Sequence, residues 1–190
     1  MAQPLFVLEN KKQRLSLYEN HLVMEWLKNK LVIEKKEVRY VAMKEFYVVD
    51  GSRTLMLYPK TQRMMGYGYD KKERAKIDEI NRFLLTKIAP DQDVKYVIYS
   101  TRWLQKMYIY EDHLRIVDIR YDKEKNPKFL TLVVEYAKVS ELKMENSRRK
   151  KAWIFRGKNG LKGFEYAFSD FNDPQYLKEA YQYIHQCLEQ

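Results

Sequence analysis

An internal repeat constrains the fold of this chain more than any other feature. The ten residues 13–22 (QRLSLYENHL) recur at 105–114 (QKMYIYEDHL), where five positions are identical and four are conservative. A second block, 38–50, recurs at 134–146 with the shared pattern Val-x-Tyr-x-x-apolar-x-Glu-apolar-x-apolar. Because both blocks recur in the same order, we predict an internal duplication of a unit of roughly 90 residues, a length that can bury its own core.

An amphipathic helix is predicted at the end of each repeat. Asp70 and Asp173 are the expected N-caps, and Pro174 suits a first helical position. Spacings of three, four and seven place the apolar residues on one face of each helix. These residues are Ile77, Ile80, Leu84 and Ile88 in the first helix, and Leu177, Ala180, Tyr181, Ile184 and Leu188 in the second. A proline and polar residues at 89–93 predict the boundary, which gives repeats 1–90 and 91–190.

Short segments rich in β-branched and aromatic residues predict antiparallel strands between these landmarks. Glu19-Asn20 and Glu111-Asp112 are predicted hairpin turns, since Asn and Asp tolerate left-handed backbone conformations. The expected strands are 5–8, 13–18, 21–27, 31–40, 45–49, 54–58 and 63–67, then 95–99, 105–110, 113–120, 129–136, 139–145, 151–155 and 163–168. The predicted fold class is mainly β (α+β), with about seven antiparallel strands and one C-terminal helix per repeat.

This order of elements resembles the pleckstrin-homology-like (PH-like) superfold, particularly its small bacterial versions, over nearly the whole chain and twice. The resemblance implies two tandem half-open barrels, each plugged at one end by its C-terminal helix. In lipid-binding members the first hairpin carries a Lys-x-Arg pattern that contacts phosphates, and Lys12-Gln13-Arg14 fits it here. The anion- or lipid-binding residues that the resemblance implies are Lys11, Lys12 and Arg14, with Lys28 and Lys30 from a later loop.

The second repeat departs from this pattern. Its corresponding loop offers only Arg102 and Lys106, with Trp103 between them. The densest basic run lies elsewhere, between two predicted strands. It is either a solvated loop or a patch that contacts an anionic membrane surface or nucleic-acid phosphates. This secondary basic patch consists of Arg148, Arg149, Lys150 and Lys151. Core packing is expected for all three tryptophans, Trp26, Trp103 and Trp153.

The charge balance favours an anionic partner such as phosphate, nucleic acid or an acidic lipid surface. The formal net charge is +10. Residues 1–90 hold 18 Lys and Arg against 11 Asp and Glu, and residues 91–190 hold 18 against 15. The excess is therefore spread along the chain. An alternative interpretation is that it serves solubility alone.

The sequence offers little catalytic chemistry. It contains no Walker-type loop, no Gly-x-Gly-x-x-Gly, no Cys-x-x-Cys and no His-Glu-x-x-His motif. His21 and His113 follow the hairpin turns, where we expect them to cap the turns or pack on Tyr18 and Tyr110. The single cysteine, Cys187, is expected to be a packed side chain of the last helix. We predict no catalytic residue, no metal site and no cofactor.

The predicted function is a non-enzymatic binding or adaptor module that recognises an anionic membrane surface or a protein partner. The start of the chain does not have the pattern of a signal peptide, and no segment approaches the ~18 apolar residues of a membrane span. We therefore expect a cytoplasmic protein, peripheral to the inner face of the membrane if it binds lipid. The alternative is a nucleic-acid-binding protein with a duplicated α+β fold, similar to the saddle of TATA-binding proteins, although no helix is predicted near the start of either repeat.

Overall fold

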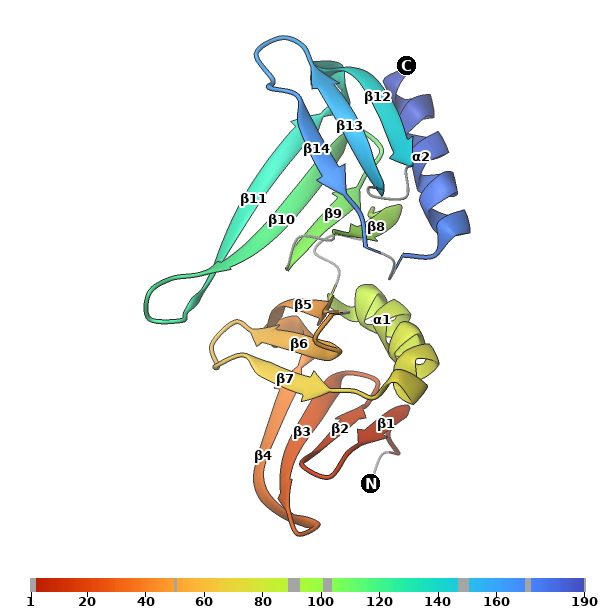
Figure 1. Ribbon diagram of the computed structural model, residues 1–190. Coiled ribbons are helices and arrows are strands. Elements are labelled where there is room, and N and C mark those ends of the chain that lie inside the picture. The colour runs from red at the N-terminus through yellow and green to blue at the C-terminus, as the bar shows by residue number, and fades with distance from the viewer. Residues whose placement is uncertain are drawn as a thin grey trace. The chain divides into compact units, whose positions relative to one another are not determined.

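The computed structural model describes residues 3–49, 51–88, 93–100, 104–146, 151–169 and 172–189 (Figure 1). The chain divides into two compact units, Met1–Pro90 (unit 1) and Asp91–Gln190 (unit 2). The described residues form four antiparallel sheets, two in each unit. The predicted mainly β class is therefore confirmed.

Unit 1 contains a four-stranded sheet in the order β1-β2-β3-β4 and a three-stranded sheet in the order β5-β6-β7, which do not pair into a closed barrel. The strands are β1 (Phe6–Glu9), β2 (Gln13–Leu17), β3 (His21–Lys28), β4 (Leu31–Arg39), β5 (Met43–Val49), β6 (Thr54–Pro59) and β7 (Met65–Gly68). A 3₁₀ turn, η1 (Tyr40–Ala42), links the two sheets, and η2 (Lys71–Glu73) leads into the helix α1 (Arg74–Ile88).

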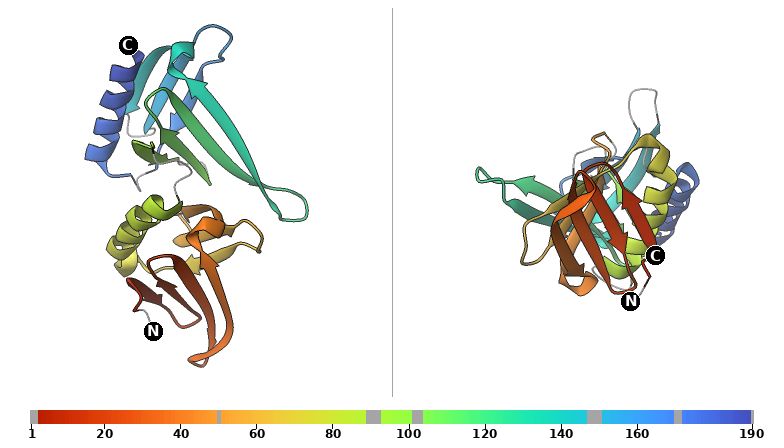
Figure 2. Two further views of the ribbon diagram at one scale, coloured as in Figure 1. Left: turned by 180° about the vertical axis from the view of Figure 1, so that it is seen from behind. Right: turned by 90° about the horizontal axis from the view of Figure 1, so that it is seen from below.

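Unit 2 has the same order of elements, with sheets β11-β10-β9-β8 and β12-β13-β14. The strands are β8 (Tyr96–Tyr99), β9 (Gln105–Ile109), β10 (His113–Tyr121), β11 (Pro127–Glu135), β12 (Val139–Asn146), β13 (Lys151–Gly157) and β14 (Phe164–Ala167). The 3₁₀ turn η3 (Tyr136–Lys138) separates the sheets, and α2 (Pro174–Leu188) follows β14. In each unit the helix lies beside the strands (Figures 1 and 2).

Alternation along the strands explains the core of each unit. Leu15 and Leu17 of β2 face the core of unit 1 together with Ile80 of α1, and all three are fully buried. In unit 2 the cluster includes Trp153 of β13 and Ile184 of α2. Full burial of such side chains contributes roughly 1.5–3 kcal/mol each. The apolar helix faces are thus what holds α1 and α2 against their strands.

Asp173 caps α2 as expected, whereas Asp70 caps the turn η2 that precedes α1. The Asp173 side chain accepts a hydrogen bond from the Tyr176 backbone N–H, and Pro174 is the first residue of α2. Asp70 and Glu73 form a reciprocal capping box, but they do so one turn earlier than α1, at η2. These contacts satisfy backbone donors that a helix otherwise leaves open.

The two hairpin turns with histidine carry matching contacts. His21 stacks on Tyr18 with ring centres 4.5 Å apart, and His113 stacks on Tyr110 at 4.3 Å. The imidazole Nδ1 of His113 also lies 2.6 Å from Asp112 Oδ1. The expected packing of both histidines on tyrosine is therefore confirmed.

None of the helices in the described residues combines the length and apolar character that crossing a membrane requires.

Candidate functional site

An open hollow of about 1450 Å³ lies at one end of unit 1. Four connections form its walls, namely the β1–β2 loop, the β3–β4 turn, the β5–β6 turn and the segment that runs from β7 into η2. Five cationic residues are among those that line it: Lys11, Lys12, Lys30, Arg53 and Lys72. Cations from four separate connections thus surround one space.

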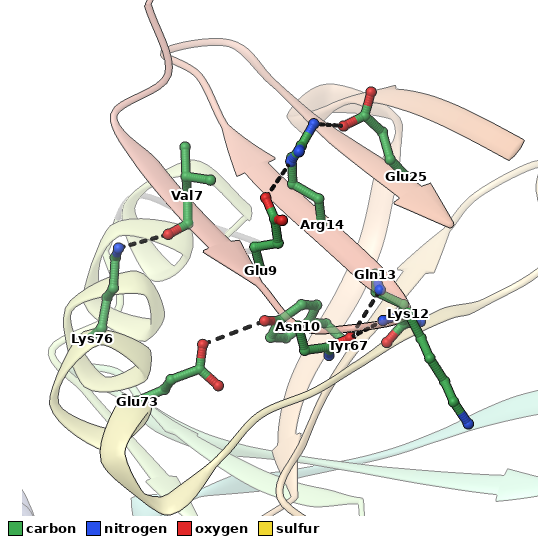
Figure 3. A network of polar contacts seen from close by, with 10 residues as sticks. All are labelled: Val7, Glu9, Asn10, Lys12, Gln13, Arg14, Glu25, Tyr67, Glu73 and Lys76. Atoms are coloured by element: carbon green, nitrogen blue, oxygen red, sulfur yellow. Dashed lines mark hydrogen bonds and ion pairs between the residues drawn. The ribbon is translucent and has the colours of Figure 1, made fainter. Parts of the chain in front are cut away.

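Side-chain amides fix the β1–β2 loop on this end of the unit. Asn10 Oδ1 accepts hydrogen bonds from the backbone N–H groups of Lys12 at 2.8 Å and Gln13 at 2.9 Å (Figure 3). Asn10 Nδ2 donates to the Gly68 carbonyl at 2.8 Å, and Gln13 Nε2 donates to the Gly66 carbonyl at 2.8 Å. The loop that carries the two lysines is therefore tied to β7.

Tight turns hold the next two cations. Asn29 and Lys30 join β3 to β4 with φ values of 52° and 67°, both in the left-handed region that a type I′ hairpin turn requires. Arg53 has a φ of 47° beside the start of β6. Left-handed backbone suits Asn29 but is uncommon for lysine and arginine, so the hairpins rather than local preference fix the backbone of Lys30 and Arg53.

The cationic and the carboxylate side chains that line the hollow differ in their ion pairs and hydrogen bonds. In the described part of the chain, the five cationic side chains form no ion pair and no side-chain hydrogen bond. By contrast, Glu9 accepts a hydrogen bond from Arg14 Nε at 2.7 Å. Glu73 accepts one from the Asp70 backbone N–H at 2.7 Å and one from the Tyr67 hydroxyl at 3.4 Å. Figure 3 shows the Lys12 side chain pointing away from this network.

Three of the five implied anion-binding residues come together at the hollow, namely Lys11, Lys12 and Lys30. Lys28 and Arg14 are not among its lining residues. Arg14 instead forms ion pairs with Glu9 at 2.7 Å and Glu25 at 3.3 Å (Figure 3). The hydrogen bond that Arg14 donates to Glu9 raises the pKa of the Arg14 guanidinium above its ordinary value. Glu9 and Glu25 therefore neutralise the charge of Arg14 within the sheet.

Sequence reasoning missed Arg53, Lys72 and Trp26. Trp26 was expected in the core, but it is half-buried and lines the hollow, with Lys36 Nζ 5.3 Å from its ring centre. Gly51-Ser52 before Arg53 is a turn signal, so the sequence did mark the β5–β6 connection. It could not show that this turn lies near the β1–β2 loop.

The corresponding end of unit 2 is organised differently. Asn172 Oδ1 accepts from the Tyr99 backbone N–H at 2.8 Å, and Asn172 Nδ2 donates to the Tyr99 carbonyl at 2.8 Å. Ser100 Oγ donates to the Ala167 carbonyl at 2.8 Å. Lys106 is fully buried in β9, with Nζ 5.2 Å from the Tyr108 ring centre. Among the described residues, hydrogen bonds thus join β8 to β14 and to the segment before α2 at this end.

Several predicted residues lie outside the described ones. These are Arg102, Trp103, Arg148, Arg149 and Lys150. Of the secondary basic patch only Lys151 is described, and it is the exposed first residue of β13. Trp153 is fully buried in the core of unit 2, as predicted.

A smaller hollow of about 720 Å³ lies in unit 2 beside the β9–β10 turn. Its lining includes three carboxylates, Asp93, Glu111 and Asp112, together with Cys187. Burial raises the pKa of the Cys187 thiol, which disfavours the nucleophilic thiolate form. No group of three or more His, Cys, Asp and Glu residues suited to a metal ion occurs within the described ranges.

Comparison with known proteins assigns no family. A scan against protein-family models gave no match, and a search of the curated proteins gave no significant match.

Proposed function

We propose that the chain is a non-enzymatic binding module of two tandem PH-like domains, and that unit 1 binds phosphate-bearing headgroups at an anionic membrane surface. The observation that carries the proposal is the hollow of unit 1, where Lys11, Lys12, Lys30, Arg53 and Lys72 meet from four connections. The order of elements, a four-stranded and a three-stranded antiparallel sheet followed by a helix, supports the PH-like part of the proposal.

The cations around the hollow favour an anion as the ligand. Several like charges around one space repel each other, and a polyanion relieves that repulsion while it accepts their hydrogen bonds. The neighbouring carboxylates already have donors, as Glu9 has Arg14 and Glu73 has the Asp70 N–H. The half-buried Trp26 adds an amphipathic ring, a residue type that favours the interface between water and lipid.

Sedimentation with vesicles tests the proposal. We expect the chain to bind vesicles that contain a phosphoinositide, and the triple variant Lys11→Ala/Lys12→Ala/Lys30→Ala to lose most of that binding. With about 1 kcal/mol per cation near an anionic surface, three cations correspond to a loss of roughly 100-fold in affinity.

A matched control separates a site from net charge. Lys35→Ala/Arg63→Ala/Arg82→Ala also removes three exposed cations of unit 1, but none of them lines the hollow. Equal losses in both variants would show that net charge alone drives binding. No binding by the unmodified chain would overturn the lipid proposal and favour a protein partner, and a salt-sensitive shift of duplex DNA would favour the nucleic-acid alternative.

A further inference from the structure

Strand β11 carries an apolar surface at the open edge of its sheet. The order β11-β10-β9-β8 places β11 at one end, and no strand pairs with its outer side in the part of the chain that the structure describes. Leu130, Leu132 and Val133 are 47%, 46% and 54% exposed. Figure 1 shows β10 and β11 as a long hairpin that reaches beyond the other strands of unit 2. This surface, residues 130–133, is called the β11 edge below.

The equivalent strand of unit 1 shows what is unusual here. At the offset of the second repeated block, residues 130–133 (Leu-Thr-Leu-Val) correspond to residues 34–37 (Glu-Lys-Lys-Glu) of β4. Strand β4 also ends its sheet, and charged side chains at such edges hinder pairing with other chains. Residues 34–37 of β4 are therefore all charged where the β11 edge has no charge, although Leu31, Val32 and Ile33 at the start of β4 are exposed as well.

The backbone of the β11 edge is oriented for pairing. The Tyr136 N–H donates to the Asp112 carbonyl at 3.3 Å, and the Asp122 N–H donates to the Asn126 carbonyl at 3.1 Å. Hydrogen-bonded pairs alternate along an antiparallel ladder, and the β10–β11 register has no shift between these two points. Even-numbered residues of β11 thus bond to β10, while Thr131 and Val133 direct their N–H and C=O groups outward.

We propose that the β11 edge is a self-association surface, where β11 of one copy of the chain pairs antiparallel with β11 of a second copy. Antiparallel pairing centred on Thr131 matches residues 129–133 of the two copies, and pairing centred on Leu132 matches residues 130–134; both sets are apolar except for Thr131. Lys128 and Glu135, at opposite ends of the strand, are 67% and 59% exposed, and each has a local ion-pair partner, Asp122 at 4.0 Å and Lys138 at 3.3 Å. Antiparallel pairing brings the cationic end of one strand near the anionic end of the other, whereas parallel pairing brings like charges together.

Features of the surface favour a second copy over an unrelated extended peptide. Recognition of a peptide by strand addition draws its specificity from pockets for alternate side chains. No residue of β11 lines either of the hollows described above, of about 1450 Å³ in unit 1 and about 720 Å³ in unit 2. Strand edges of this size give weak interfaces, so we expect an association that depends on protein concentration in the micromolar range.

Sedimentation equilibrium tests the proposal, from roughly 1 to 500 μM chain. The unmodified chain should form dimers, and Thr131→Lys/Val133→Lys should weaken dimerisation about tenfold or more, since both registers then juxtapose lysines. Both side chains are exposed, so the variant should keep its fold, which circular dichroism checks. Thr131→Val/Val133→Thr preserves the apolar, β-branched surface and should dimerise normally. A chain that stays monomeric throughout, or a lysine variant that dimerises as well as the unmodified chain, would overturn the proposal.

Discussion

A buried tyrosine ties each repeat's first sheet to the 3₁₀ turn that follows it. The Tyr40 hydroxyl donates to the Tyr18 carbonyl at 2.8 Å, and the Tyr136 hydroxyl donates to the Tyr110 carbonyl at 2.9 Å. Tyr40 and Tyr136 belong to the Val-x-Tyr pattern of the repeated block, so the sequence marked these positions before their contacts were known. At this scale the two units share a contact as well as a motif.

Removing one such hydroxyl should destabilise its unit. Tyr136→Phe deletes a buried hydrogen bond to the Tyr110 carbonyl, so we expect the free energy of unfolding to fall by about 1 kcal/mol. Urea denaturation measures the change. The control is Tyr96→Phe, because the Tyr96 hydroxyl forms no hydrogen bond among the described residues. Equal losses in the two variants would contradict a specific role for the Tyr136 bond.

Two tyrosines of unit 2 predict how the stability of the fold depends on alkaline pH. Burial raises the pKa of Tyr136 above its ordinary value of 10.0 and raises the pKa of Tyr183 to about 12. Below about pH 10 both folded and unfolded chains keep these protons, so the stabilisation is fully present. Above it the unfolded chain ionises first, so stability should decrease as pH rises toward 12. Urea midpoints at increasing pH measure this slope, and Tyr136→Phe should make it shallower; an unchanged slope would exclude Tyr136 as a contributor.

At the scale of elements, local sequence patterns were sufficient to predict most strands and both helices. Apolar residues after the Glu19-Asn20 turn predicted β3, which is observed at His21–Lys28. The turns η1 and η3 were not predicted, since Tyr-Val-Ala and Tyr-Ala-Lys continue the apolar pattern of the preceding strands. The hollow was predicted only in part, since lysines close to one another in sequence can be grouped from sequence alone. Placing Arg53 beside them required the pairing of β5, β6 and β7.

The N-cap of α2 provides a prediction for a whole element. Asp173→Ala removes the acceptor for the Tyr176 N–H, so unit 2 should lose about 1 kcal/mol of stability. Asp173→Asn keeps an acceptor oxygen and should lose much less. Thermal denaturation followed by circular dichroism compares the two variants. If the alanine and asparagine variants melt together below the unmodified chain, the charge of Asp173 matters rather than its capping bond.

At the scale of the whole molecule, the two units use one order of elements for different surfaces. Unit 1 places cations around an open end and charges at residues 34–37 of its edge strand β4. At the corresponding end of unit 2, Asn172 joins β8 to the β14–α2 segment, and β11 has an apolar edge. Under the two proposals above, unit 1 would bind the anionic ligand and unit 2 would bind another copy of the chain. Self-association would then double the number of hollows on one assembly and raise its avidity for a surface.

Cross-linking can identify the register of that assembly. Cys187 is the single cysteine, so Cys187→Ser leaves a background in which only an introduced thiol reacts. Pairing centred on Thr131 places this residue opposite its own copy at a Cα separation of about 5.5 Å, and pairing centred on Leu132 gives about 4.5 Å. Both separations suit a disulfide. Thr131→Cys should therefore cross-link in the first register and Leu132→Cys in the second. A dimer in which neither residue cross-links under oxidising conditions would exclude antiparallel β11 pairing, whereas preferential linkage at one of them fixes the symmetry axis on that residue.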